Sequence, residues 1–318
     1  MKVWIIIGTI LVLLGLALFA TVMTANGWNF KALSTATLET NVTPIDEDFQ
    51  HLSIKTDTAH ITLVATENAA ARVECYEEEN AKHAVTVEDG TLHVRLKNEK
   101  KWYEHIDVNF EAPQITVYLP KAAYGTLSIE GHTGDITLPK DFSFESIDIA
   151  VTTGDVTCHT SATEKMKIKA STGSIRADDI RTDLLDLSVT TGRIAVRSAT
   201  CGDVTIRVST GKTVLTDVTC HNLITRGNTG DLVLRRTTAT DGFTVERTTG
   251  DVIFDASDAT SLSVTTDTGD VTGTLLSEKI FVTSTDTGHV SVPKTTAGGR
   301  CEITTDTGNI KIEILKQK

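Results

Sequence analysis

Three Asp-Thr-Gly triplets carry the first side chains that could do chemistry, and they begin at Asp267, Asp286 and Asp306. Aspartic proteases need two such carboxylates to meet and share one proton. In this chain the aspartate fills a repeated position that Thr152 and Ser171 fill in earlier copies. A position that accepts aspartate, threonine or serine is typical of a turn, so we interpret these aspartates as turn residues rather than catalytic acids.

Further aspartates follow glycines in the same repeats, and stacked repeats would bring several carboxylates to one edge. Carboxylate oxygens are the ligands that Ca²⁺ prefers. The aspartates that such a calcium site would use are Asp251, Asp267, Asp270, Asp286 and Asp306. The column after the glycine also contains Arg193, Lys212 and His289, and the glycine-aspartate nonapeptide of calcium β-rolls is absent. We therefore favour solvated turns and keep calcium as the alternative.

Two of the five cysteines have matching positions in neighbouring repeats. Cys201 and Cys220 lie nineteen residues apart, and each follows its repeat glycine by nine residues. Stacked repeats would place them close enough for a disulfide if their Cβ vectors agree. We favour a ladder of small buried residues over the disulfide. No partner is evident for Cys75, Cys158 or Cys301.

Other signatures of chemistry are absent from the sequence. It contains no H-E-x-x-H motif, no G-x-S-x-G elbow and no glycine loop for phosphate. The net charge of −12, without a cluster of Lys and Arg along the chain, argues against a nucleic-acid partner. We predict no catalytic residue, no cofactor and no enzymatic activity.

A Thr-Gly pair recurs with a spacing of 19 or 20 residues through the C-terminal two-thirds of the chain. A constant period of this length is the signature of stacked repeats. The turn glycines are Gly134, Gly154, Gly173, Gly192, Gly211, Gly230, Gly250, Gly269, Gly288 and Gly308. Glycine suits a tight corner because it accepts positive φ without strain.

Apolar residues alternate with polar ones on both sides of each glycine. Around Gly173 they are Met166, Ile168 and Ala170 before the turn, and Ile175 after it. Alternation with period two indicates short strands with one buried face. The sequence therefore predicts an all-β fold: a two-sided, right-handed β-solenoid of 19–20-residue rungs over residues 134–318, in which each threonine before a glycine stacks on its equivalent.

Residues 46–133 depart from this pattern but retain part of it. The segment Leu52–Ile61 matches Leu262–Val271, with Ala59 in place of the glycine. Val85 to Leu96, around Asp89-Gly90, reads as a β-hairpin. We expect a degenerate rung with a hairpin insertion that caps the first end of the array, because an exposed strand edge needs cover.

The first 25 residues form the least polar segment. Val3 to Ala25 carries no charge, and 23 helical residues rise about 35 Å, enough to cross a bilayer core. We predict an uncleaved single-pass anchor over residues 1–25, with a cleaved signal peptide as the alternative, and a linker over residues 26–45. Lys2 favours a cytoplasmic N-terminus, which leaves the rest of the chain outside the cell.

Four segments carry a family resemblance: L-S-I-K-T from residue 52, D-G-T-L-H-V from residue 89, I-T-V-Y-L-P-K at 115–121 and L-S-I-E-G-H-T-G-D-I-T-L at 127–138. With the serial T-T-G-D turns, the chain resembles the bacterial "putative adhesin" β-strand-repeat family of unknown function. The resemblance covers about residues 45–318. It implies a β-helix-like fold and membrane-anchored relatives in cell-envelope-stress loci of the Lia type, and it supplies no catalytic residues.

These expectations combine into a membrane-anchored, extracytoplasmic β-solenoid that binds or scaffolds at the bacterial cell envelope. Its partner would be an envelope protein or a cell-wall polymer. One alternative is a β-helix carbohydrate-active enzyme acting on that polymer. Another is a structural array that associates with itself through its C-terminal edge, where the chain ends I-K-I-E-I-L-K-Q-K and the lysines would guard against strand pairing.

Overall fold

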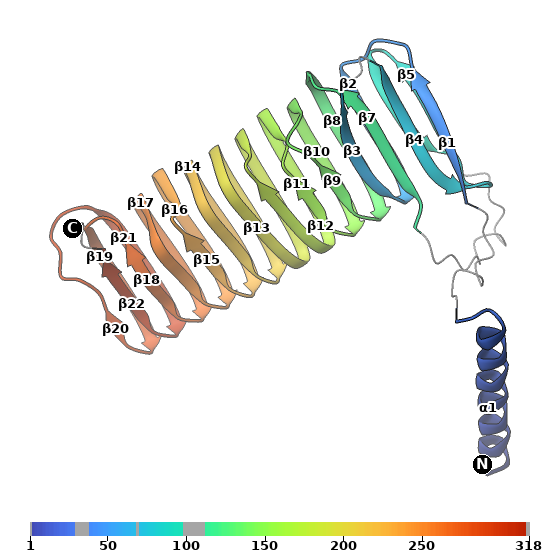
Figure 1. Ribbon diagram of the computed structural model, residues 1–318. Coiled ribbons are helices and arrows are strands. Elements are labelled where there is room, and N and C mark those ends of the chain that lie inside the picture. The colour runs from blue at the N-terminus through green and yellow to red at the C-terminus, as the bar shows by residue number, and fades with distance from the viewer. Residues whose placement is uncertain (1, 29–37, 68–69, 98–111, 316–318) are drawn as a thin grey trace.

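The computed structural model describes residues 2–28, 38–67, 70–97 and 112–315. The strands, from residue 38 onward, stack side by side into an elongated rod (Figure 1). The helix α1 (Lys2–Ala25) forms the N-terminal part of the described chain.

The helix α1 has the length and composition of a membrane span. Trp4–Ala25 has a mean hydropathy of 2.8. Every side chain from Trp4 to Val22 is exposed, and most of them are apolar. Such a surface is stable in lipid and unfavourable in water. The helix therefore corresponds to a membrane anchor or to a signal sequence.

The rod is a β-solenoid, as the repeat predicted. Each rung, named here by its turn glycine, consists of a strand, the Thr-Gly corner and a second strand. Equivalent residues of successive rungs pair in parallel: Ile147 pairs with Leu127 on one side and Met166 on the other. These inward side chains are fully buried. The alternating pattern thus builds one continuous apolar core along the rod.

The strands before and after each corner form two faces, and two strands, β12 and β13, run around the Thr-Gly corner without interruption. The strands of the regular array are β8 (Ala123–Thr133), β9 (Ile136–Leu138), β10 (Ser143–Thr153), β11 (Val156–Cys158), β12 (Ser161–Asp178), β13 (Arg181–Thr210), β14 (Thr213–Thr229), β15 (Leu232–Arg235), β16 (Thr238–Thr249), β17 (Val252–Thr268), β18 (Val271–Leu275), β19 (Lys279–Thr287), β20 (Val290–Ser291), β21 (Gly299–Thr307) and β22 (Ile310–Ile314).

All ten turn glycines adopt positive φ, between 121° and 159°. Stacking adds a second requirement, because each glycine packs directly on the backbone of the rung beside it. A Cβ built on Gly211 would lie 1.6 Å from the carbonyl oxygen of Gly192. The glycines are therefore needed for both conformation and contact, and the threonines before them stack in register as predicted, Thr153 between Thr133 and Thr172.

A second corner lies six residues after the turn glycine in five successive rungs. It places non-glycine residues in the left-handed region, at φ between 44° and 57°. The residues are Asp179, Ser198, Asp217, Arg236 and Ala256. Sequence patterning missed this corner because its residue types differ from rung to rung, and aspartate accepts left-handed φ more readily than most residues.

The N-terminal end of the rod is covered by a cap in which parallel and antiparallel strand pairs are combined. The strands here are β1 (Leu38–Ile45), β2 (His51–Thr58), β3 (His60–Thr66), β4 (Ala71–Glu78), β5 (His83–Glu88), β6 (Thr91–Leu96) and β7 (Gln114–Pro120). β2 and β3 form the degenerate rung, joined at Ala59 and paired in parallel with β8 and β9. β6 and β7 lie outside them.

The hairpin predicted around Asp89-Gly90 is present as β5 and β6, which pair antiparallel. The linker predicted over residues 26–45 is wrong for its second half. Residues 38–45 form β1, which pairs antiparallel with β4 and closes that side of the cap. Covering a strand edge satisfies its backbone groups, which is the physical reason for this extra strand. Residues 29–37 lie outside the described part of the chain.

The C-terminal rungs do not stack in sequence order. β21 pairs with β17 on one side and with β19 on the other. Likewise β22 lies between β18 and β20. The prediction that the C-terminal segment forms the exposed edge is therefore wrong: β22 is interior, and β19 with β20 forms the end of the rod. Lys316 and Lys318 lie outside the described residues.

The apolar content of the two rungs explains this order. The inward residues Cys301 and Ile303 of β21 and Ile310 of β22 are completely buried. In the end rung Thr283 pairs with Ile303 and Val290 pairs with Ile310, so the end rung is the less apolar of the two. The more apolar rung gains more by lying in the interior, where both of its sides are covered.

Candidate binding surface

Aspartates of the turn column hydrogen-bond the backbone of the next rung. In each case a carboxylate oxygen accepts the N–H of the residue after the turn glycine of the rung stacked beside it. The bonds run to Asp135 from Asp155 (2.8 Å), to Asp155 from Ser174 (2.7 Å), to Asp251 from Asp270 (2.9 Å) and to Asp270 from Asn309 (2.7 Å). These side chains therefore satisfy backbone donors at the corner, which is a structural role.

The five aspartates considered for calcium do not converge. Asp267, Asp306 and Asp286 occupy one exposed column in that order, as the pairing of their neighbours shows. Within the described residues, no three carboxylates of this edge bring ligand atoms within 4.8 Å of one another. The geometry favours solvated turns over a calcium site.

Cys201 and Cys220 lie in adjacent rungs, as their spacing predicted, and both are buried free thiols. The structure thus has the ladder of small residues and not the disulfide. Burial raises the pKa of each thiol to about 12. Such thiols stay protonated at neutral pH and are poor nucleophiles.

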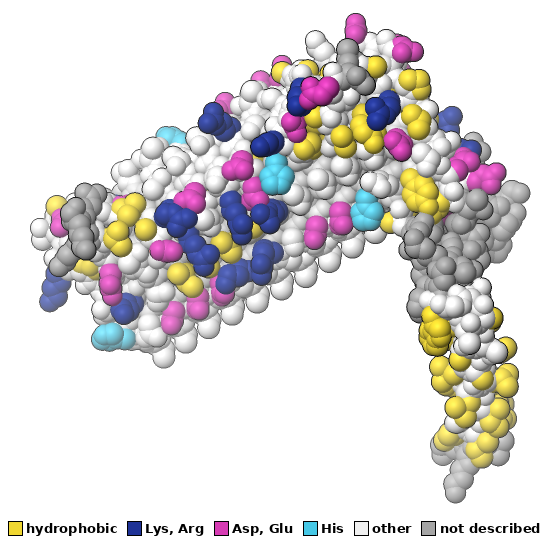
Figure 2. Space-filling view, in the orientation of Figure 1, with side chains coloured by type: hydrophobic (Ala, Val, Ile, Leu, Met, Phe, Trp, Pro, Cys, Tyr) yellow, Lys and Arg dark blue, Asp and Glu magenta, His cyan; other side chains and the backbone are white. Residues whose placement is uncertain are grey.

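Cationic side chains gather where the sequence shows no run of them. Residues 161–236 contain twelve Lys and Arg against eight Asp and Glu, in a chain whose net charge is −12. Figure 2 shows Lys and Arg side chains concentrated midway along the rod, with acidic side chains among them. We call residues 161–236 the basic belt. The solenoid creates it by stacking residues that lie about twenty positions apart.

The register specifies how the belt is built. Arg207 pairs with Arg226, and Arg193 stands directly after its turn glycine beside Ser174. Like charges in register repel one another unless anions lie between them. Neighbouring acidic side chains reduce this repulsion: Arg207 forms an ion pair with Asp186 at 2.8 Å, and Arg226 forms one with Glu246 at 2.8 Å.

Five cations of the belt have no ion pair with any described residue. They belong to the Gly173 and Gly192 rungs and lie on both faces and at the corner. They are Lys165, Lys169, Arg181, Arg193 and Arg197. All except Lys165 are exposed. Unpaired and exposed cations retain their full attraction for an external anion, so this part of the belt is the strongest candidate for a binding surface.

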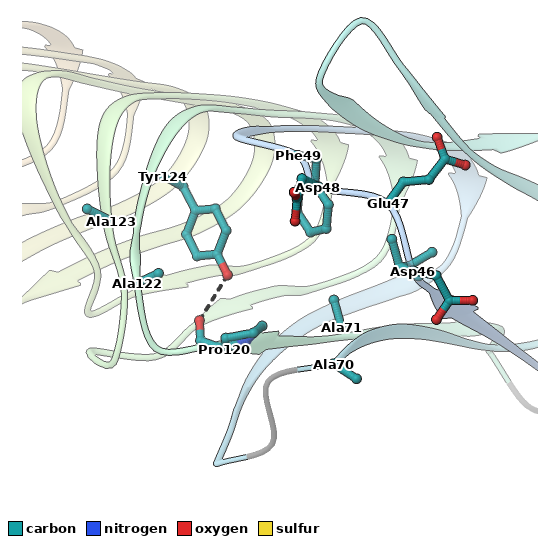
Figure 3. Close-up of a pocket in the computed structure, with 11 residues that line it drawn as sticks. Asp46, Glu47, Asp48, Phe49, Ala70, Ala71, Pro120, Ala122, Ala123 and Tyr124 are labelled. Carbon is teal, nitrogen blue, oxygen red and sulfur yellow. Dashed lines mark hydrogen bonds between the residues drawn. The ribbon is translucent and has the colours of Figure 1, made fainter.

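A pocket of about 480 Å³ lies beside the cap, between the loop before β2 and the start of β8 (Figure 3). Phe49 stacks on Tyr124 with ring centroids 6.1 Å apart, and Tyr124 stacks on Phe144 at 5.6 Å. The Tyr124 hydroxyl donates to the Pro120 carbonyl at 2.9 Å. This aromatic ladder continues the core stacking into the corner of the cap, and its only buried polar group is satisfied.

The family model described as Toastrack DUF4097 matches residues 49–215 and 200–318. No curated protein matches the sequence. Among solved structures, the rod is similar to a "putative adhesin" from Bacteroides fragilis, with 13% identity, a TM-score of 0.42, and coverage of 86% of this chain and 97% of that one.

A "putative lipid binding protein" from Parabacteroides distasonis is similar at 14% identity and a TM-score of 0.43, covering 87% of this chain and 98% of that one. A "putative adhesin" from Parabacteroides merdae is similar at 13% identity and a TM-score of 0.42, covering 89% and 98%. Because the family model spans nearly all of the chain after the N-terminal helix, this protein belongs to the Toastrack DUF4097 family.

Proposed function

We propose that this protein is a membrane-anchored, extracytoplasmic scaffold that binds an anionic polymer of the bacterial cell envelope through the basic belt, without catalysing a reaction. The observation that carries the proposal is the set of unpaired cations in two successive rungs of an otherwise acidic rod. A polymer that bears regularly spaced phosphates or carboxylates can follow the regular spacing of the rungs.

The anchor is supported by α1. Its apolar surface is long enough to span a bilayer, and Lys2 precedes it on the side expected to remain in the cytoplasm. Protease added to intact cells should digest the solenoid, and the membrane fraction should contain the chain at its uncleaved mass. A soluble chain that begins after Ala25 would show a signal peptide instead.

Binding is tested with the full-length protein in detergent micelles. The probes are teichoic acid, neutral dextran and double-stranded DNA, and the readout is affinity as a function of salt. We expect saturable binding to teichoic acid that weakens as salt rises, with no binding to dextran. Equal affinity for dextran, or a stronger affinity for DNA, would contradict the proposal.

A matched pair of variants locates the surface. Lys169→Glu with Arg193→Glu should weaken binding about tenfold or more, because two unpaired cations become repulsive anions. Lys140→Glu with Lys294→Glu makes the same change in net charge outside the belt and should leave the affinity within about twofold. Release of soluble fragments from the polymer would favour the carbohydrate-active enzyme.

A further inference from the structure

Three side chains with metal-ligand chemistry meet inside the cap, away from the basic belt. Cys75 and Glu77 point inward from β4, and His83 begins β5 after the intervening turn. One ligand atom from each lies within 4.8 Å of the others. The Cys75 residue is 3% exposed, and the side chains of Glu77 and His83 are each 2% exposed.

Hydrogen bonds hold two of these groups in fixed orientations. One oxygen of Glu77 accepts from the His83 backbone N–H at 2.7 Å and lies 2.6 Å from His83 Nδ1. The other oxygen accepts from the Asn41 amide at 2.9 Å. His83 Nε2 lies 2.9 Å from the Thr56 hydroxyl. Partners of this kind orient ligands around protein-bound metals.

Burial makes this cluster unusual. A carboxylate and an imidazole inside a protein lose their hydration, and an apolar pair would fill the same space with less loss. The Cys75 thiol beside them forms no hydrogen bond with Glu77 or His83 in the structure. Thiolate, imidazole and carboxylate are, however, the three side-chain ligands that Zn²⁺ takes in proteins.

We propose that Cys75, Glu77 and His83 bind one Zn²⁺ ion inside the cap, through Sγ, a carboxylate oxygen and Nδ1. At a tetrahedral Zn²⁺ ion with bonds of about 2.0 to 2.3 Å, the ligand atoms lie about 3.3 to 3.7 Å apart. The three ligand atoms here lie within 4.8 Å of one another, and the Glu77 and His83 atoms, 2.6 Å apart, would separate slightly to admit the ion. Three protein ligands leave a fourth position for water. The ion would tie β4 to β5 at the outer end of the rod.

Binding of the ion changes the protonation of Cys75 and fixes the position of the proton on His83. The ion displaces the thiol proton of Cys75, which leaves to solvent. Nδ1 can bind the ion only when it carries no proton, so the imidazole proton then lies on Nε2, where it is donated to the Thr56 hydroxyl oxygen. Binding therefore releases the thiol proton of Cys75 and keeps both imidazole nitrogens engaged.

The test uses the full-length protein in detergent micelles, freed of metal by a chelator, with Co²⁺ as the spectroscopic probe. We expect one equivalent of Co²⁺ to give a thiolate-to-metal charge-transfer band, which Zn²⁺ then removes by displacement. Cys75→Ser should abolish the band, whereas Cys158→Ser, another buried thiol, should retain it. Uptake without a charge-transfer band, or a band that survives Cys75→Ser, would overturn the proposal.

Two further variants keep the test valid if Cys75→Ser fails to fold. Glu77→Gln conserves shape and should lower Co²⁺ affinity about 100-fold, and Asn41→Ala should lower it about tenfold by releasing the carboxylate. The melting temperature of the wild type should rise with added Zn²⁺, and that of Glu77→Gln should not. A wild-type melting temperature that is unchanged by Zn²⁺ would also overturn the proposal.

Discussion

Gly308 lies directly against Gly269, although the Gly288 turn comes between them in the sequence. A Cβ on Gly308 would lie 2.0 Å from the Gly269 carbonyl oxygen, and a Cβ on Gly288 would lie 1.9 Å from that of Gly308. The Gly288 rung therefore forms the end of the rod. The Gly308 rung, which follows it in the sequence, lies between the Gly269 and Gly288 rungs. Gly299 permits the close return, because a Cβ there would lie 1.7 Å from the Thr260 carbonyl oxygen.

The substitution Ile312→Ala tests whether β22 lies in the interior of the rod. Ile312 is 2% exposed, so its truncation should lower the free energy of unfolding by about 2 to 4 kcal/mol. Lys311→Ala, on the exposed side of the same strand, should change it by less than about 0.5 kcal/mol. Chemical denaturation gives both values. A small effect at Ile312 would mean that β22 forms the exposed end.

The exposed end is β19, which presents Ile280 at 45% and Val282 at 44% exposure. An unpaired apolar edge strand promotes association between copies. We expect Ile280→Lys with Val282→Lys to lower light scattering at high protein concentration. Thr265→Lys with Thr304→Lys adds the same charge to paired strands β17 and β21 and should leave scattering unchanged. Equal reductions would show a general effect of charge.

Gly211→Ala should destabilise the array. The glycine has φ of 140°, and a Cβ there would lie 1.6 Å from the backbone oxygen of Gly192 in the preceding rung. Strain and clash together should lower the free energy of unfolding by about 2 to 4 kcal/mol. At Gly131 the nearest atom to an added Cβ is Thr56 Cγ2 at 3.8 Å, so Gly131→Ala serves as the tolerated control. Thermal melting compares them.

Arg247→Met should stabilise the protein. Arg247 is 3% exposed, and none of its three guanidinium nitrogens has a hydrogen-bond partner. It extends over Gly227, and burial lowers its pKa to about 10. Replacing an unpaired buried charge with an apolar side chain of similar size should raise the free energy of unfolding by about 1 to 4 kcal/mol. Arg226→Met, at an exposed ion pair, should have little effect. A loss of stability in Arg247→Met would contradict this account.

Cys158 should be unreactive in the native protein. It is completely buried, and burial raises the pKa of its thiol from 9.0 to about 12. A thiol reagent at about pH 8 should label it only after denaturation. Because the raised pKa belongs to the folded state, the stability it contributes is complete below pH 9 and is lost as pH rises toward 12. The stability difference between wild type and Cys158→Ser should therefore narrow over that range. Fast native labelling, assigned by mass spectrometry, would contradict the burial.

Local sequence patterns were sufficient to predict the rung. A glycine at a corner with positive φ, flanked by alternating apolar residues, has few structural solutions, and its recurrence around Gly173 or Gly211 predicted both the turn and the buried faces. The degenerate rung at Ala59 and the hairpin at Asp89-Gly90 followed from the same local patterns. Local patterns do not record which rung stacks on which, because the Gly288 and Gly308 units share one pattern.

The order of the last rungs, the basic belt and the cluster in the cap depend on how distant parts of the chain pack together. Arg207 and Arg226 become neighbours because the rung height is shorter than the reach of their side chains, whereas nineteen residues separate them along the chain. Glu77 near the end of β4 and His83 at the start of β5 come together because the turn between the two strands directs both side chains into the interior of the cap. Long-range stacking brings these groups together, and stacking energy depends on the burial of whole rungs rather than on any local motif.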